Sequence, residues 1–245
     1  MGASAADIVT MLDDLGLTVA AIRLKELLKS PELANYSGQQ LLREVIMPQH
    51  VESMNSRYIT NRKFSKLINK DARTENLKTG NGRKYNDEVI RQVLTFQFVP
   101  DALNIGIYGK TGAGKSYCMS ALCDEACHQN FRCMLLDYSD LLDELLVLAQ
   151  KEDLEKYRKK LRYYSKIRLL FIDDFAISRY SEDGIKILYH LIKTRTDLGN
   201  STVFTCQYDP SEWGKQLSDD AECYGKLDGI RRRLTTGYTI YIEKA

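Results

Sequence analysis

The sequence has little of what marks several common classes of protein. Its three histidines, His50, His128 and His190, are dispersed, and therefore indicate neither a metal site nor a nucleophile cluster. The six cysteines form no C-x-x-C pair, so we expect reduced thiols. No apolar run approaches the roughly 20 residues of a membrane span, and MGASAADIVT lacks the pattern of a secretory signal. These absences favour a cytoplasmic protein with no membrane partner.

The charge is nearly balanced, at a net +2, but it is unevenly distributed. Residues 57–91 hold ten basic and four acidic side chains, and residues 151–168 hold eight basic and three acidic ones with three tyrosines between them. Such clusters are typical of surfaces that bind the phosphate backbone of nucleic acid. They are also typical of solvated helix faces, and the sequence leaves both interpretations open.

The stretch GKTGAGKS, residues 109–116, fits the pattern G-x-x-x-x-G-K-[ST] of a nucleotide-binding phosphate loop. Its backbone N–H groups wrap phosphates, the lysine reaches the β- and γ-phosphates, and the final hydroxyl binds Mg²⁺. The helix that follows adds its positive N-terminal end. The sequence therefore predicts ATP and Mg²⁺ as cofactors, with these nucleotide-binding residues: Gly109, Lys110, Thr111, Gly112, Ala113, Gly114, Lys115, Ser116 and Tyr117.

The N-terminal part of the chain has the apolar spacing of helices. We expect helices over 5–15 and 18–29, and a third that opens at Ser37, with a capping-box glutamine at Gln40 and a break or kink at Pro48. The polar, glycine-containing stretch 78–83 predicts a linker. We therefore expect a helical domain over residues 1–78, which binds DNA or a partner, and an ATPase domain over residues 79–245.

The second domain alternates short apolar runs with helical segments, which is typical of a parallel α/β sheet flanked by helices. The predicted strands are 104–108, 132–137, 168–173, 202–207 and 238–242. Because such folds bind ligands at the carboxyl ends of their strands, the phosphate loop, Asp173 and Gln207 are expected at one edge of the sheet.

Two acids end the apolar run LLFIDD. Asp173 is predicted to hold Mg²⁺ through water, together with Ser116, while Asp174 polarises the water that attacks ATP. Gln207, at the end of the next strand, is a candidate sensor of the γ-phosphate. Lys115, Asp174 and Gln207 belong to the predicted catalytic set. One arginine of GIRRRL joins them if it acts on the nucleotide of a neighbouring subunit, although such a run is also typical of basic surface.

The sequence resembles the IstB-type transposition helper ATPases, relatives of the DnaC-type helicase loaders in the AAA+ class. The resemblance rests on NIGIYGKTGAGKSY, ALCDEAC, LLFIDDF, STVFTCQYDPSEW and GIRRRL. It implies an ATP-dependent homo-oligomer that binds double-stranded DNA with little sequence preference and assists a DDE transposase in target capture and strand transfer. It also points to Arg233 as the arginine that acts in trans, although Arg232 replaces the acid that commonly precedes it.

Three alternatives remain at this stage. A DnaC-like helicase loader would use the same ATPase core with a different partner. An ATP-gated DNA-binding scaffold would bind ATP but scarcely hydrolyse it, and a small-molecule kinase would stay monomeric and ignore DNA. The sequence does not give the partner, the number of subunits or the residues that contact DNA.

Overall fold

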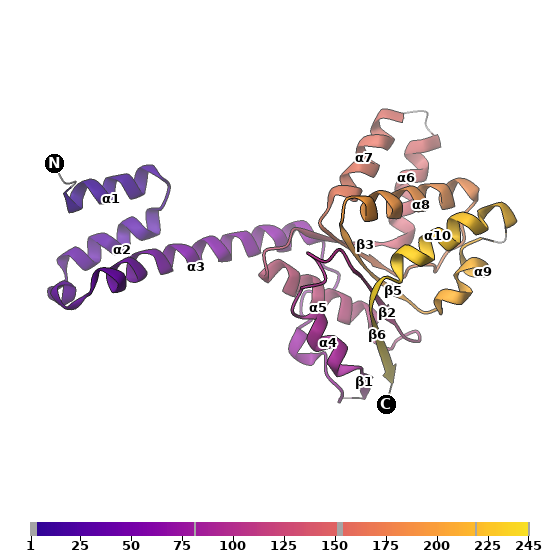
Figure 1. The fold of residues 1–245 in the computed structure, drawn as a ribbon, viewed down its shortest axis with the longest axis horizontal. Helices are drawn as coiled ribbons and strands as arrows, with labels where there is room; N and C mark the ends of the chain where they lie inside the picture. Colours follow the sequence, from indigo (N-terminus) through magenta and orange to yellow (C-terminus); the bar gives the residue numbers. More distant parts are fainter. Residues whose placement is uncertain (1–3, 81, 151–153, 219, 245) are drawn as a thin grey trace. The chain divides into compact units, whose positions relative to one another are not determined.

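The computed structural model describes residues 4–80, 82–150, 154–218 and 220–244 (Figure 1). Lys151, which opens the second basic cluster, lies outside these residues. The chain divides into two compact units, Met1–Thr60 and Asn61–Ala245. The second unit begins before the expected boundary at 78/79, because the segment after residue 60 packs on the helix that follows the phosphate loop. Arg62 donates to Asp124 of that helix at 2.8 Å, and Asn76 donates to the hydroxyl of Tyr117 at 2.7 Å.

The first unit is helical, as expected. Its elements are α1 (Ala5–Asp14), α2 (Thr18–Lys29), the short helix η1 (Pro31–Asn35) and the first part of α3 (Gly38–Ser65). A small apolar core joins them, made by Val9, Ala20, Ala21, Leu24, Leu27 and Val45. The predicted capping box is present, since Ser37 N donates to the Gln40 side chain at 2.9 Å and Gln40 N donates to Ser37 Oγ at 3.3 Å.

Of the break or kink expected at Pro48, the break does not occur, since α3 continues through the proline to Ser65. Proline has no backbone N–H to donate to the carbonyl of residue 44, and most residues around that carbonyl are partly or fully exposed. The neighbouring residue, Gln49, accepts hydrogen bonds from Val19 N at 3.1 Å and Ala20 N at 3.3 Å, which caps the first turn of α2.

The second unit is built on a six-stranded sheet in the order β1-β6-β2-β5-β4-β3. The strands are β1 (Arg83–Tyr85), β2 (Asn104–Tyr108), β3 (Cys133–Asp137), β4 (Leu169–Asp173), β5 (Ser201–Cys206) and β6 (Gly237–Lys244). All neighbouring pairs are parallel except β1 with β6. The predicted parallel α/β fold is thus confirmed, and the strands expected from apolar runs lie within two residues of their predicted ends.

Helices cover both faces of this sheet (Figure 1). One face carries α6 (Tyr138–Gln150), α7 (Leu154–Lys166), α8 (Glu182–Asp197) and α10 (Tyr224–Leu234), which share a core with alternate residues of β3, β4 and β5. On the other face α5 (Lys115–His128) packs against β2, β3, β4 and β5, and α4 (Asp87–Val93) packs against β6. Trp213 begins the short α9 (Trp213–Leu217). The alternation of side chains along each strand lets both layers bury apolar residues.

All six cysteines are free and buried, as the sequence predicts. Among the described residues no helix has the length and apolarity needed to cross a membrane. In the predicted linker 78–83, Gly80 pairs with Arg83 at the start of β1, an edge strand that the sequence did not predict, while Asn81 lies outside the described residues.

Candidate nucleotide-binding site

The phosphate loop connects the end of β2 to the start of α5. Gly112 and Gly114 adopt positive φ angles of 72° and 106°, a conformation that costs glycine little. The Lys115 side chain is 7% exposed, and its Nζ donates to Gly109 O at 3.0 Å and to Lys110 O at 3.4 Å. The lysine is therefore held across the loop, and the free N–H groups at the start of α5 favour an anion there.

The predicted acid pair lies at the carboxyl end of β4. Asp173 is 5% exposed, whereas Asp174 is exposed and has a left-handed φ of 51°. Such a backbone costs a non-glycine residue of order 1–3 kcal/mol and persists only where neighbours impose it. Thr205 of β5 imposes it, because its hydroxyl accepts from Asp174 N at 2.8 Å and donates to Asp173 Oδ1, while its carbonyl accepts from Phe175 N at 2.8 Å.

The electrostatic surroundings of Asp174 suit a group that polarises water. Partial burial is the largest cause of a pKa raised above the ordinary value of an aspartate, and the adjacent Asp173 carboxylate raises it further. Lys115 opposes both effects by lowering the pKa, which places the lysine and the acid pair in one electrostatic site. An elevated pKa makes a carboxylate a better proton acceptor.

The described residues contain no group of three or more His, Cys, Asp or Glu side chains arranged to hold a metal by themselves. The ligands that the sequence predicts for Mg²⁺ are Ser116 at the start of α5 and Asp173 at the end of β4. Both offer hard oxygen donors, and Mg²⁺ usually takes one or two protein oxygens beside water and phosphate.

Gln207, the predicted sensor, reaches the phosphate loop. Its Oε1 accepts from Thr111 Oγ1 at 2.9 Å, which joins the tip of the loop to the end of β5. Trp213 of the SEW motif is 1% exposed and packs on Phe175, with ring centroids 4.8 Å apart. Since Phe175 directly follows the acid pair, Trp213 supports the turn that presents Asp174.

Arg233 lies near the amino-terminal end of strand β2, whereas the phosphate loop follows the carboxyl end of the same strand. Its carbonyl accepts from Asn104 Nδ2 at 2.7 Å, and Asn104 is the first residue of β2, whereas the loop follows the last. Five residues of strand separate the two edges, a distance of roughly 13 Å at about 3.3 Å per residue. The guanidinium instead lies 5.4 Å from the ring centroid of Tyr189 and donates to Gly229 O at 2.9 Å.

The other two arginines of the run have a different role. Arg231 pairs with Asp228 at 2.6 Å, and Arg232 pairs with the second oxygen of the same carboxylate at 3.0 Å. Within the described chain, Arg233 has no carboxylate partner. Of the three arginines, it is therefore the one that meets an incoming anion without first breaking an ion pair.

The sequence model of the family described as IstB-like ATP binding protein matches residues 10–234 of this chain. The chain belongs to the IstB-like family. Its relatives include the insertion sequence ATP-binding protein y4uH of Sinorhizobium fredii, 23% identical over 222 residues, which are 91% of this chain and 88% of that protein. Another is the ATP-binding protein of insertion sequence IS1162 from Pseudomonas fluorescens, 27% identical over 62% of this chain and 64% of that one.

Solved structures show the same fold for this IstB-like chain. DnaI superposes with a TM-score of 0.58 and 22% identity, over 71% of this chain and 92% of that one. Replication initiator DnaA bound to AMPPCP and single-stranded DNA gives a TM-score of 0.57 and 19% identity, over 73% of this chain and 51% of that one. The chain thus spans about half of the DnaA chain it matches, and both likenesses show a shared fold.

Three residues at the site of this IstB-like chain were not predicted from the sequence. Thr205 lies two residues before Gln207, so a period-two reading of the strand would have placed both side chains on one face. Arg83 and Lys244 touch the phosphate loop from β1 and β6. Nothing in the local sequence indicates their position, because it depends on the pairing of two strands far apart in the chain.

Proposed function

We propose that this IstB-like protein is a Mg²⁺-dependent ATPase that oligomerises on double-stranded DNA and assists a DDE transposase in target capture and strand transfer. The observation that carries the proposal is the arrangement at the end of β4. There Thr205 holds Asp173 and fixes the backbone of Asp174, beside Lys115 of the phosphate loop. A protein that only bound ATP would need the loop but not a second, exposed carboxylate held in a strained conformation.

Each residue then has a separate task in hydrolysis. Lys115 neutralises the β- and γ-phosphates, and Ser116 and Asp173 hold Mg²⁺, which supplies charge neutralisation at the phosphates when bound. Asp174 accepts the proton of the attacking water. Gln207, joined to Thr111 at the tip of the loop, senses whether the γ-phosphate is present.

Arg233 completes the site of a neighbouring subunit. Because it lies at the opposite edge of the sheet from its own phosphate loop, it acts on a second protomer rather than in its own site. An arginine supplied in trans stabilises the charge on the transferring phosphoryl group. A nucleotide placed between subunits couples ATP binding to assembly, and assembly adds together many weak contacts with DNA.

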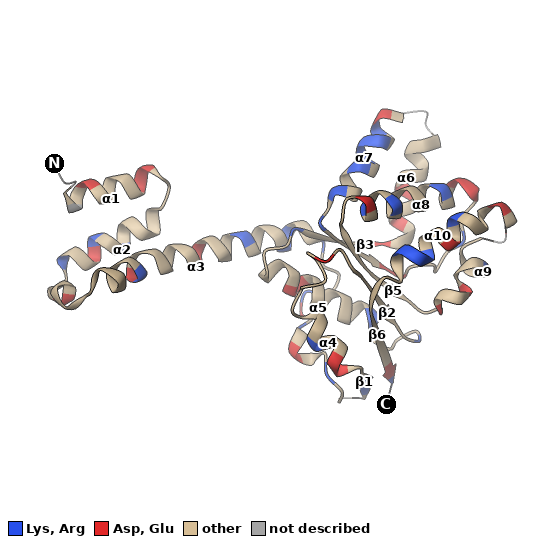
Figure 2. Ribbon diagram, viewed as in Figure 1, with Lys and Arg blue, Asp and Glu red and all other residues tan. Residues whose placement is uncertain are grey.

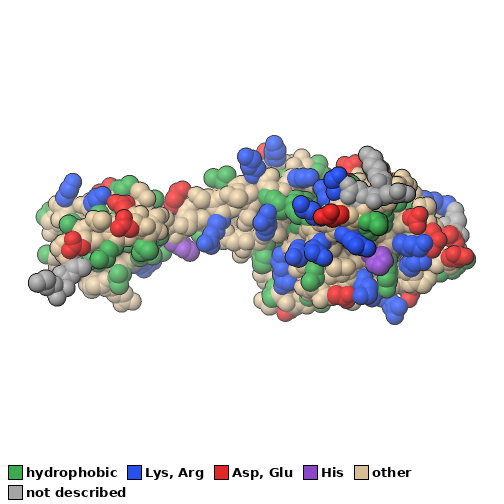
Figure 3. All heavy atoms as spheres, turned by 90° about the horizontal axis from the view of Figure 1, so that it is seen from above, with side chains coloured by type: hydrophobic (Ala, Val, Ile, Leu, Met, Phe, Trp, Pro, Cys, Tyr) green, Lys and Arg blue, Asp and Glu red, His purple; other side chains and the backbone are tan. Residues whose placement is uncertain are grey.

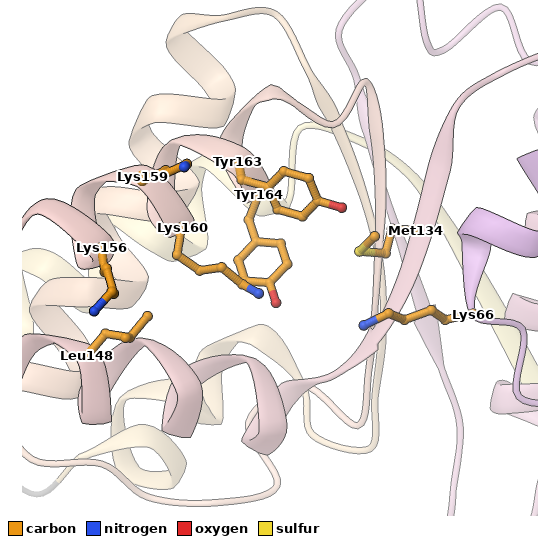
Figure 4. Close-up of a pocket in the computed structure, with 8 residues that line it drawn as sticks. All are labelled: Lys66, Met134, Leu148, Lys156, Lys159, Lys160, Tyr163 and Tyr164. Carbon is orange, nitrogen blue, oxygen red and sulfur yellow. The ribbon is translucent and has the colours of Figure 1, made fainter.

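The two basic clusters of the sequence meet on the second unit, where they offer a surface for DNA. Helix α7 carries six basic residues and one acidic residue (Figure 2). Lys66 of the first cluster and Lys156, Lys159 and Lys160 of α7 line one pocket of about 440 Å³, with Tyr163 and Tyr164 (Figure 4). Figure 3 shows basic side chains gathered on one face of this unit. Such a surface suits phosphates, with little dependence on base sequence.

Light scattering with ATP or ADP, with and without a duplex of about 60 base pairs, tests the proposal. We expect ATP and DNA together to give a large, defined assembly that Lys115→Ala abolishes. Reversing Lys156 and Lys159 to Glu should weaken DNA binding and flatten its salt dependence, while Lys193→Glu on α8, whose lysine pairs with Asp197, serves as the matched control. A protein that stays monomeric in every condition contradicts the proposal.

The principal alternative is a helicase loader, which would use the same site with another partner. Adding a DDE transposase or a replicative helicase to the ATP-bound assembly separates the two, since only the true partner changes ATP turnover. The third possibility, an ATP-gated scaffold, is tested by Asp174→Asn. In an ATPase this substitution removes turnover and preserves the ATP-bound assembly, whereas in a scaffold it changes neither.

A further inference from the structure

Two basic residues face each other across the edge of the sheet. In the antiparallel pair of β1 with β6, Arg83 lies directly opposite Lys244. Like charges in this position repel and destabilise a strand pair. In the described chain neither side chain has an ion pair with a carboxylate, although the neighbouring register position pairs Lys84 with the acidic Glu243. No ion pair with a described carboxylate therefore offsets the repulsion between Arg83 and Lys244.

Both side chains reach the phosphate loop. Arg83 Nε donates to Ala113 O at 3.0 Å and lies 2.8 Å from the position that a Cβ on Gly114 would occupy. Lys244 Nζ lies 3.3 Å from the corresponding position on Gly112. These two glycines have the positive φ angles that shape the loop. A side chain at Gly114 would collide with the guanidinium, so the glycine also makes room for Arg83.

The two cations lie on a different side of the loop from the hydrolytic residues. Thr111, at the tip, is bonded to Gln207 of β5, whereas Gly112 and Gly114 face Arg83 and Lys244 at the β1–β6 edge. Next to the loop lies a cavity of about 530 Å³, lined by Lys110 and Lys244 as well as by Gln207 and the acidic Asp209 and Glu243.

We propose that Arg83 and Lys244 are binding residues for the nucleotide, and that they contact its phosphate groups from the β1–β6 edge. An anion in the loop relieves the repulsion between the two cations, which the apo protein cannot do. The inference rests on the nucleotide binding that the proposed function requires, and it adds two residues to that site. Since ATP and ADP both carry phosphates in the loop, the two cations stabilise both bound nucleotides.

Titration calorimetry with MgATP and with MgADP on Arg83→Ala and Lys244→Ala tests the proposal. A hydrogen bond to a charged group corresponds to an affinity change of about tenfold to a hundredfold, so each variant should bind both nucleotides more weakly by that factor. Lys84→Ala is the matched control, since it removes the same charge from the same strand without touching the loop.

Magnesium pyrophosphate, used as a competitor of MgADP, distinguishes a phosphate contact from a contact with the base or ribose. Its affinity should fall in both variants by the same factor as that of MgADP. Unchanged affinity for all three probes would overturn the proposal. So would weaker nucleotide binding with unchanged pyrophosphate binding, because the contact would then be to the nucleoside.

A purely structural role for Arg83 predicts something different. If its bond to Ala113 O only braces the loop, Arg83→Ala lowers the melting temperature of the apo protein, and Lys244→Ala leaves the affinity for nucleotide unaffected. That pair of results overturns the proposal. If Arg83→Ala does not fold, Arg83→Lys and Arg83→Gln replace it in the measurement. Arg83→Lys keeps the charge and should bind MgADP more tightly than Arg83→Gln does. Absent ATP turnover in the unmodified protein would contradict the proposed function, while the MgADP measurements still decide this inference.

Discussion

The hydroxyl of Thr205 donates a hydrogen bond to the carboxylate of Asp173, from one strand to the next. The same oxygen accepts from the backbone N–H of Asp174 at 2.8 Å. One buried hydroxyl thus orients Asp173, the proposed Mg²⁺ ligand, and fixes the main chain of Asp174, which we propose activates water. Thr205 is a positioning residue, since it acts on the chemistry through its two neighbours.

Thr205→Val should lower turnover by about tenfold to a hundredfold, the usual effect of removing a group that orients a metal ligand. Valine has nearly the same shape, so the fold should be kept while the hydrogen bonds are lost. Thr205→Ser keeps the hydroxyl and should stay close to the unmodified protein. The measurement is turnover as a function of Mg²⁺ concentration: a role limited to packing would leave the Mg²⁺ dependence of the valine variant unchanged.

The pH dependence of turnover should reflect the raised pKa of Asp174. A carboxyl group accepts a proton only when ionised, so turnover rises with pH through this pKa and reaches a plateau above it. Because burial and the charge of Asp173 raise the pKa, the acid limb should lie at higher pH than for a free aspartate. Rates at saturating ATP between about pH 4 and 8 check this. A flat profile down to the ordinary pKa of aspartate contradicts the assignment of Asp174 as the base.

Mixing variants tests whether Arg233 acts on a neighbour. Arg233→Ala has an intact nucleotide site and Lys115→Ala an intact arginine, so each should be inactive alone, Arg233→Ala by about a thousandfold. When the two variants are mixed, some subunit interfaces join an intact nucleotide site to an intact Arg233. Part of the turnover should then return. Arg232→Ala is the control, because Arg232 is engaged with Asp228 and its loss should leave turnover largely intact. Recovery that fails to appear would place Arg233 outside the nucleotide site.

Trp213 should contribute strongly to stability. It is 1% exposed and packs between Phe175 and Phe204, with ring centroids at 4.8 and 5.5 Å. Replacing a buried tryptophan with alanine typically lowers the free energy of unfolding by about 3–5 kcal/mol. Urea unfolding of Trp213→Ala should show a loss of this size, and Trp213→Phe a smaller one. A loss below about 1 kcal/mol in the alanine variant would mean that the turn after Asp174 is supported by other contacts.

The sheet was largely predictable because its signals are local. Each buried parallel strand is a short apolar run, as in LLFID, and the polar residue that follows it lies at the edge where ligands bind. The acid pair was found in the same way, and the phosphate loop was found from its glycine and lysine pattern. Strand β1 was missed because Arg83–Tyr85 carries two charges, follows two glycines and pairs only at the edge of the sheet.

The residues that complete the site were harder to predict because their roles arise between distant segments. Thr205 meets Asp173 across 32 positions of sequence, and Arg83 faces Lys244 from nearly the other end of the second unit. Pro48 shows the converse. The signal is local, but the break, one of the two effects it predicts, does not occur because the helix continues through the loss of one hydrogen bond.

The buried thiol of Cys118 allows local opening of α5, the helix that follows the phosphate loop, to be measured. Cys118 lies two residues after Ser116 on α5, fully enclosed, and burial raises the pKa of its thiol to about 12. An alkylating reagent therefore modifies it only when the helix opens locally and the thiol meets water. A bound nucleotide makes such opening rarer by mass action. The rate of alkylation of the Cys118 sulfur thus measures, without any added label, how strongly each nucleotide suppresses local opening of α5.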